Sequence, residues 1–216
     1  MEEYLKDLPK IEGVGIAVDI DETLSNTIGY LVDKMLEEFG CREGLSSEEI
    51  IKKYRYTWNV PDWKSEEALL FIKNIVDQND FQLNLPLVDS ALESLNLIHE
   101  EVPVVCYVTA RLENVSEGTK KWLSKNGFPD AELICRPQLL DRTKSDEWKA
   151  RVLERLGANV VGIIDDNSGI LKHLDEGYGG KVFLYSHKEH ESPLAVCCED
   201  WKSVKDRVLE HFGNKS

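Results

Sequence analysis

The sequence has 216 residues, of which 42% are hydrophobic and 31% are charged, and its formal net charge is −14. This length suits one domain, or one domain with a sizeable insertion, and the apolar fraction is sufficient for a hydrophobic core. The strong negative charge repels a phosphate backbone, so we expect no duplex nucleic acid as a partner.

The sequence contains no apolar run of about 18 residues, which predicts that the chain does not span a membrane. Its first residues, MEEYLKDLPK, lack the apolar region of a secretory signal, so we expect a cytoplasmic protein. The five cysteines are odd in number and form no CxxC pair, which does not favour a disulfide framework or a zinc site. Nothing in the sequence indicates the oligomeric state.

Short apolar runs rich in Val and Ile alternate with helical patterns along most of the chain. The runs predict buried parallel strands at residues 14–19, 104–109, 131–135, 160–165 and 181–185. The helical patterns lie at residues 87–99, 115–126, 146–156, 168–174 and 200–212. This alternation predicts an α/β fold, a three-layer, Rossmann-like parallel sheet with strand order 3-2-1-4-5 in its core.

The segment between the first and second predicted strands is longer than one crossover helix requires. Residues 27–39 form an amphipathic pattern that Gly40 ends, and the Ser46 and Glu49 pair is typical of a capping box. A further helix is expected after Ser65. We therefore predict a helical subdomain at residues 27–85, inserted into a core formed by residues 1–26 and 86–216.

Two predicted strands end in paired acids. The first ends in Asp19 and Asp21, and the fourth ends in Asp165 and Asp166. In the predicted order these strands are neighbours at the switch point of the sheet, where ligands of open α/β folds bind. Converging carboxylates need a cation, and oxygen-only ligands favour Mg²⁺. The alternative interpretation, that the first two acids only cap a turn, does not account for the second pair.

The second predicted strand ends in Thr109, Ala110 and Arg111, which offer a hydroxyl, backbone N–H groups and a guanidinium to the same crevice. Lys144 and Lys149 lie between the third and fourth strands. A lysine here would balance the carboxylates and contact a phosphate oxygen. A carboxylate nucleophile in such a setting can attack phosphorus and form an aspartyl-phosphate.

These motifs, in this order, resemble those of the haloacid-dehalogenase-like (HAD) hydrolase superfamily, and its phosphatase branch in particular. The resemblance implies that Asp19 is the nucleophile and a Mg²⁺ ligand. Asp21 would be the general acid–base and would bind the metal through its backbone carbonyl. Asp165 and Asp166 would complete the metal site. The second acid, Asp21, is typical of the phosphatase branch and absent from the dehalogenase branch.

The resemblance also implies roles for the residues around these acids. Thr23 would shape the turn near the acid–base, and Thr109 with the Ala110 N–H would hold the phosphoryl group. The motif lysine is either Lys149, which we favour because it lies in the first turns of a helix, or Lys144 in the preceding loop.

The inserted subdomain resembles a helical cap of the first type, which closes over small substrates. It contains four aromatic residues within YRYTWNVPDW, and we weigh packing in the cap against base stacking, for which Trp58 is the candidate. The Thr-Ala-Arg order around Arg111 resembles nucleotidases and polynucleotide phosphatases, so Arg111 is a candidate substrate contact.

These expectations lead to a Mg²⁺-dependent phosphatase acting on a small phosphomonoester, such as a nucleoside monophosphate, through an aspartyl-phosphate on Asp19. Whether water or another acceptor takes the phosphoryl group stays open, because the same intermediate serves a hydrolase and a phosphotransferase. Two further alternatives stay open. One is a polynucleotide end phosphatase, against which the negative charge and the cap argue. The other is a catalytically silent binding module of the same fold, against which the complete set of expected acids argues.

Overall fold

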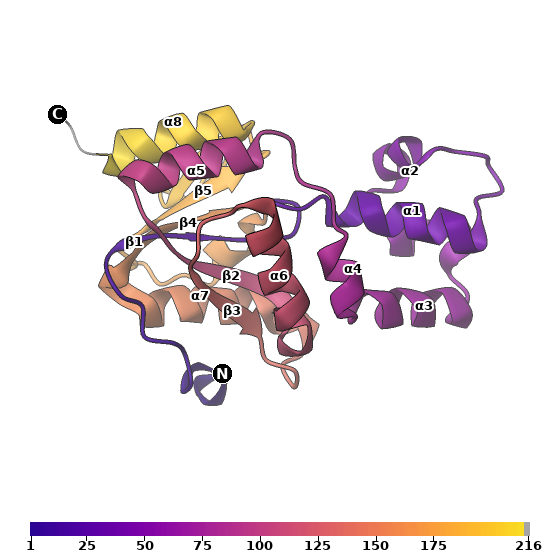
Figure 1. Cartoon of the computed structure of the whole chain (residues 1–216), viewed down its shortest axis with the longest axis horizontal. Helices are drawn as coiled ribbons and strands as arrows, with labels where there is room; N and C mark the ends of the chain where they lie inside the picture. Colours follow the sequence, from indigo (N-terminus) through magenta and orange to yellow (C-terminus); the bar gives the residue numbers. More distant parts are fainter. Residues whose placement is uncertain (214–216) are drawn as a thin grey trace.

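A six-stranded parallel sheet forms the centre of the computed structural model, which describes residues 1–213 (Figure 1). The last three residues of the predicted core, 214–216, lie outside the described residues. The strands are β1 (Gly15–Val18), β2 (Val104–Leu112), β3 (Glu132–Arg136), β4 (Val160–Asp165), β5 (Lys181–Tyr185) and β6 (Ala195–Cys198). Their order is β3-β2-β1-β4-β5-β6, with every neighbouring pair parallel.

The predicted order of the five core strands is therefore confirmed, and the predicted α/β class with it. The sequence analysis missed β6, which pairs with β5 at the edge of the sheet. Three of its four residues are only half-buried, so it lacks the continuous apolar run that marks a central strand.

Helices cover both faces of the sheet and make three layers. One face carries α5 (Ala91–Glu101), α6 (Ser116–Asn126) and α8 (Trp201–Phe212), and the other carries α7 (Ser145–Leu156). Within β1, Ile16 and Val18 pack on the first face and Ala17 on the second, as the period of two along a strand requires. A strand buried on both faces explains the unbroken apolar run before the first acids.

Short 3-10 helices connect several of these elements. They are η1 (Glu2–Leu5), η4 (Glu113–Val115), η5 (Arg142–Lys144), η6 (Gly157–Asn159) and η7 (Ser168–Lys172) in the part around the sheet. The helix expected at residues 168–174 is one of them, η7. The helix expected at residues 87–99 begins later, at Ala91, because Ser90 adopts a left-handed conformation with φ 63°.

The segment predicted as an insertion forms helices that lie to one side of the sheet (Figure 1). They are α1 (Thr27–Phe39), α2 (Ser47–Tyr54), η2 (Thr57–Asn59), η3 (Pro61–Trp63), α3 (Glu66–Val76) and α4 (Asn79–Leu83). The capping box of Ser46 and Glu49 forms as predicted, and Ser65 caps α3. Apolar residues such as Met35 and Trp63 are fully buried between these helices.

The chain enters and leaves this helical segment along two strands of backbone that run side by side. The Asn26 N–H donates to the Pro86 carbonyl at 2.9 Å, and the Val88 N–H donates to the Leu24 carbonyl at 2.8 Å. At the exit, α4 packs on α6, where the Gly118 N–H donates to the Asn79 side chain at 2.6 Å. The entry and exit connections of the helical segment are thus adjacent and joined by hydrogen bonds.

Within residues 1–213, no helix combines the length and the apolar character that crossing a lipid bilayer demands.

Candidate active site

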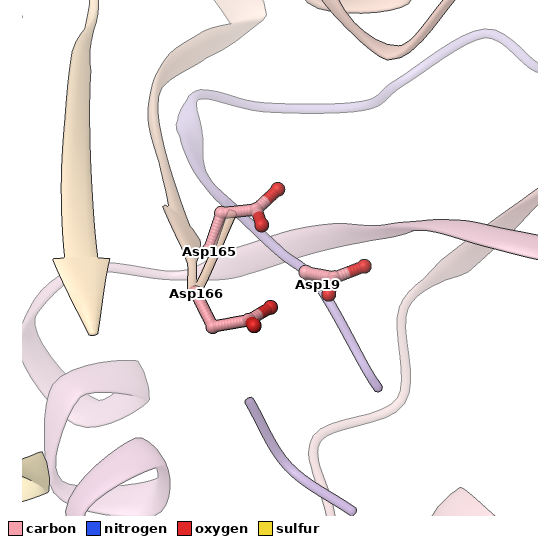
Figure 2. Close-up of side chains that lie close together, drawn as sticks. All are labelled: Asp19, Asp165 and Asp166. Carbon is pink, nitrogen blue, oxygen red and sulfur yellow. The ribbon is translucent and has the colours of Figure 1, made fainter. Parts of the chain in front are cut away.

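The acids at the ends of β1 and β4 meet because these strands are neighbours in the sheet (Figure 2). The Asp19 N–H donates to the Ile164 carbonyl at 2.9 Å, which fixes Asp19 just beyond the last residue of β1. Ile20 is fully buried in the core, between the two acids in the sequence.

Three carboxylates converge at this edge. Oxygens of Asp19, Asp165 and Asp166 all lie within 4.8 Å of one another, and the first two side chains are almost completely buried. Burial and the neighbouring carboxylates raise the pKa of Asp19 to about 7 and that of Asp166 to about 8. Burial is the larger cause of both shifts, and the repulsion between the carboxylates adds to it.

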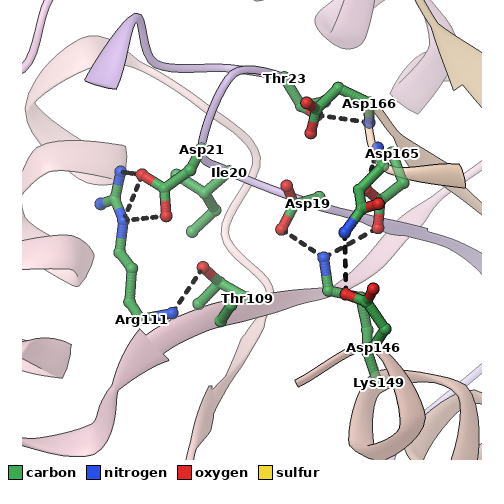
Figure 3. A network of polar contacts seen from close by, with 12 residues as sticks. Asp19, Ile20, Asp21, Thr23, Thr109, Arg111, Asp146, Lys149, Asp165 and Asp166 are labelled. Carbon is green, nitrogen blue, oxygen red and sulfur yellow. Dashed lines mark hydrogen bonds and ion pairs between the residues drawn. The ribbon is translucent and has the colours of Figure 1, made fainter. Parts of the chain in front are cut away.

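Lys149, on α7, is the cation that faces the cluster. Its ammonium donates to Asp19 Oδ1 and to Asp165 Oδ2, both at 2.8 Å, and only 3% of the residue is exposed (Figure 3). Burial alone would lower the pKa of Lys149, but the two carboxylates raise it, so the ammonium stays charged. The other candidate lysine, Lys144, is exposed at the end of η5.

One lysine facing three carboxylates leaves two negative charges uncompensated when all three are ionised. Carboxylate oxygens alone make up the donor set, and hard divalent cations prefer such oxygens. The cluster therefore fits a divalent ion such as Mg²⁺ in both charge and ligand type. It is the only group of potential metal ligands of this kind found among residues 1–213.

Two threonines with fully buried side chains frame the cluster. Thr23 Oγ1 accepts a hydrogen bond from the Asp166 N–H at 3.1 Å, so the loop after β1 holds the loop after β4. Thr109 lies within β2, which runs beyond the end predicted at residue 109, and its Oγ1 accepts a bond from the Arg111 N–H at 3.2 Å. Ala110, which lies between Thr109 and Arg111 in the sequence, is exposed near the carboxyl ends of the strands.

Asp21 lies on the opposite side of the loop from Lys149 and pairs with Arg111 (Figure 3). The guanidinium Nη2 lies 2.7 Å from Asp21 Oδ1, and Nε lies 3.1 Å from both carboxylate oxygens. Burial alone would raise the pKa of Asp21, but Arg111 and the Thr27 hydroxyl lower it below its usual range. Arg111, the candidate substrate contact of the sequence analysis, is thus turned toward a carboxylate of the protein.

The sequence analysis overlooked two residues that support the loops. Glu22 has φ 58°, a left-handed conformation that costs a non-glycine residue about 1 kcal/mol. Its carboxylate accepts a bond from the Ile28 N–H at 2.7 Å, at the start of α1. His187 Nε2 lies 2.8 Å from the Asp166 carbonyl oxygen. The acid-rich motif pointed to Glu22, whereas no sequence signal pointed to His187.

The aromatic residues of the helical segment divide into two groups. Trp63 is fully buried and its indole N–H donates to the Gly40 carbonyl at 2.8 Å, as the packing interpretation expects. Trp58 is 51% exposed and stacks on Tyr56 with ring centroids 4.5 Å apart. Trp58 therefore presents an aromatic face outside the core.

The sequence matches no family model and no curated protein, but many solved structures share the fold. A putative phosphatase from Clostridium difficile superposes with a TM-score of 0.57 at 16% identity, over 92% of this chain and 100% of that one. A HAD-superfamily hydrolase of subfamily IA from Geobacter sulfurreducens gives 0.56 at 17%, over 93% and 100%. The putative HAD hydrolase YfnB from Bacillus subtilis, bound to magnesium, gives 0.51 at 12%, over 91% and 99%.

Other structures of the same fold are described as dehalogenases, including an L-2-haloacid dehalogenase. At these identities the likeness concerns the fold, and the chemistry has to be argued from the residues. These superpositions cover more than 90% of this chain. The chain has the fold of the haloacid-dehalogenase-like hydrolases.

Proposed function

We propose that this protein is a Mg²⁺-dependent phosphatase that cleaves small phosphomonoesters through an aspartyl-phosphate on Asp19. The observation that carries the proposal is the pair of carboxylates on either side of Ile20. Asp19 faces the buried lysine and the acidic cluster, while Asp21 is held separately by a buried arginine. One carboxylate is thus available to attack and a second, two residues on, is available to move protons.

Asp19, Asp165 and Asp166 are the side chains that would hold Mg²⁺, with Asp21 contributing its backbone carbonyl. The ion, when bound, neutralises negative charge on the phosphoryl oxygens and on the cluster. The charge count supports this assignment, because three carboxylates face a single ammonium. The fold neighbour from Bacillus subtilis that is bound to magnesium supports it as well.

In the first step a carboxylate oxygen of Asp19 attacks phosphorus, and the bond from phosphorus to the ester oxygen breaks. Asp21 takes up a proton from solvent before this step, against the low pKa that Arg111 imposes, and gives it to the departing oxygen, which leaves as an alcohol. Lys149, Thr109 and the Ala110 N–H bind the phosphoryl oxygens during the transfer. The products of this step are the free alcohol and an aspartyl-phosphate.

In the second step water attacks the phosphorus of the aspartyl-phosphate. Asp21, now a carboxylate, takes a proton from the water as the bond from phosphorus to the Asp19 oxygen breaks. Inorganic phosphate leaves and both aspartates return to their starting state. The second carboxylate is therefore used in both steps.

The chemistry favours a phosphatase over a dehalogenase, although both kinds of protein share this fold. A halide ion leaves without needing a proton, so a dehalogenase has no first-step task for Asp21. A departing alkoxide needs one. The Asp21 side chain, fixed by Arg111 at the edge of the site, supports the reaction that uses it.

We further propose that residues 27–85 act as a cap over the site and that its substrate is small, a nucleoside monophosphate being the leading candidate. The adjacent entry and exit segments would form the hinge. The exposed Trp58 and its stacked neighbour Tyr56 offer an aromatic face that suits a nucleobase.

The first experiment measures inorganic phosphate released from a panel of small phosphate esters, with Mg²⁺ and with excess chelator. We expect release that requires the metal and is lost in Asp19→Asn. The matched control is Asp141→Asn, which changes an exposed aspartate before η5 and should keep the activity. Chloride release from 2-haloacids, measured in parallel, should be absent.

The panel also separates the alternatives. Far better hydrolysis of a DNA 3′-phosphate than of any mononucleotide would favour a polynucleotide end phosphatase. No release from any ester, with Mg²⁺ binding demonstrated by calorimetry, would favour a silent binding module. Metal-dependent release that survives in Asp19→Asn would contradict the aspartyl-phosphate route.

A further inference from the structure

The Arg111 guanidinium is almost completely enclosed, with 4% of its side chain exposed. Besides Asp21, it donates to Ser25 Oγ at 2.9 Å and to Thr119 Oγ1 at 3.3 Å, and it lies 5.8 Å from the centre of the Trp122 ring. A guanidinium has five N–H donors, and these contacts engage four of them. Little capacity remains for a substrate phosphate.

The two carboxylate oxygens of Asp21 accept different numbers of hydrogen bonds. Oδ1 accepts from the Thr27 hydroxyl at 2.6 Å and from Arg111 Nη2 at 2.7 Å, and Nε also lies within 3.1 Å. Oδ2 has a single partner, Nε, at 3.1 Å. Since a carboxylate oxygen has two lone pairs, Oδ1 is saturated and Oδ2 keeps a free position.

We infer that Arg111 is a positioning residue for Asp21 and not a substrate contact. This inference rests on the proposed function, in which Asp21 moves the protons. The two-pronged pair fixes the plane of the carboxylate and leaves Oδ2 as the oxygen that exchanges protons with the ester oxygen and then with water.

The position of Arg111 in the fold explains why it suits this task. Arg111 follows Thr109 by two residues on β2. The same strand therefore positions both Asp21, the proposed acid–base, and the hydroxyl proposed to bind the phosphoryl group. The bonds of Arg111 to Ser25 and Thr119 tie the loop after β1 to α6. The carboxylate that moves protons is therefore held by β2 through Arg111 as well as by Thr27 at the start of α1.

The test is a double-mutant cycle with Arg111→Lys and Asp21→Asn, assayed on the best ester of the panel. Lysine keeps the buried positive charge, so the variant should fold, but it cannot form the two-pronged pair. We expect Arg111→Lys to lower kcat about tenfold with KM within about twofold, because a displaced acid–base slows proton transfer. In the Asp21→Asn background the same change should cost less than about twofold, since its effect passes through Asp21.

The matched control is Thr119→Val, which removes another partner of Arg111 but leaves the pair with Asp21, and it should keep kcat within about twofold. Two results would overturn the inference. One is an equal loss of kcat from Arg111→Lys with and without Asp21. The other is a rise in KM, or in the inhibition constant of inorganic phosphate, that matches the loss in kcat, which would indicate a substrate contact.

A measurement without turnover keeps the inference separate from the proposed function. The Arg111 Nε–H resonance, followed by ¹⁵N NMR, should shift in Asp21→Asn and stay in place when inorganic phosphate is added to the native protein with Mg²⁺. A shift with phosphate as large as that in Asp21→Asn would sink the inference. If the native protein hydrolyses no ester, the proposed function fails, and this resonance still decides which group Arg111 serves.

Discussion

Lys149 and Arg111 are both buried cations at the same edge of the sheet, yet they hold their carboxylates in different ways. Lys149 is a point charge shared between Asp19 and Asp165, in a cluster that still lacks positive charge. Arg111 faces one carboxylate, Asp21, through two prongs, and that pair is neutral. The first arrangement has room for a metal ion, whereas the second is complete without one.

Positive charge and hydrogen-bond geometry therefore have different functions within one site. In the proposed reaction a phosphoryl group and a metal bind and leave beside Lys149, where a compact ammonium can serve several oxygens in turn. Where one side chain has to keep its orientation, a planar fork fixes it. Substitutions of the two cations and of their carboxylates test each of these differences.

The largest effect is expected from removing each cation in turn. Lys149→Met leaves the buried carboxylates of Asp19 and Asp165 unpaired and should lower the free energy of unfolding by about 3–5 kcal/mol in chelator. Arg111→Gln should cost less, because the Asp21 side chain that it leaves unpaired is 32% exposed. Added Mg²⁺ should restore much of the loss in Lys149→Met, because the ion supplies charge to the same cluster. It should restore little in Arg111→Gln. Urea unfolding with and without Mg²⁺ measures both, and equal rescue of the two variants would contradict the comparison.

Glu22 is a further carboxylate near these pairs, and it accepts a hydrogen bond from the Ile28 backbone N–H instead of facing a cation. Burial raises the pKa of Glu22 from 4.5 to about 7. The folded state therefore keeps a proton that the unfolded state loses between these values, and stability falls as the pH rises through this window.

We expect Glu22→Gln to remove this loss, which amounts to about 3 kcal/mol for such a shift. The native protein and the variant should differ little at pH 4.5, and the variant should be the more stable above pH 7. Unfolding curves against pH in chelator test this, since metal binding would perturb the neighbouring acids. A stability difference that does not change with pH would show that the Glu22 carboxyl titrates normally.

Metal binding should depend on the Lys149 side of the site alone. At a Mg²⁺ concentration about 100 times its Kd, the native protein should gain about 2.7 kcal/mol of stability. Asp165→Asn should lose this gain. Asp21→Asn should keep it, because only the Asp21 backbone carbonyl is assigned to the metal. Thermal melts against Mg²⁺ concentration provide the measurement, and a loss in both variants would show that the two sides are not separate.

The smallest effect is expected from Lys144→Ala. Lys144 is exposed at the end of η5, outside the cluster that Lys149 faces. Its removal should change kcat by less than about twofold and the free energy of unfolding by less than about 0.5 kcal/mol. A large loss of phosphate release would show that this loop lysine reaches the substrate.

Much of the molecule follows from local patterns in the sequence. The apolar runs indicate the five core strands, and the acids after two of them indicate the site, because parallel strands end at one edge. Ser46 with Glu49 and Ser65 mark helix starts correctly, because capping is decided within four residues.

The tertiary structure decided what depends on partners far away in the chain. The sequence offered two lysines, and the contact of Lys149 with Asp19, across 130 positions, distinguishes them. The motif around Arg111 indicates a candidate substrate contact, and the structure shows that its guanidinium pairs with Asp21, 90 positions away. The edge strand β6 and the bond from His187 to the loop of Asp166 likewise left no local signal. Local patterns determine which helix, strand or loop carries a side chain, whereas the partner of that side chain is determined only when the whole sheet has assembled.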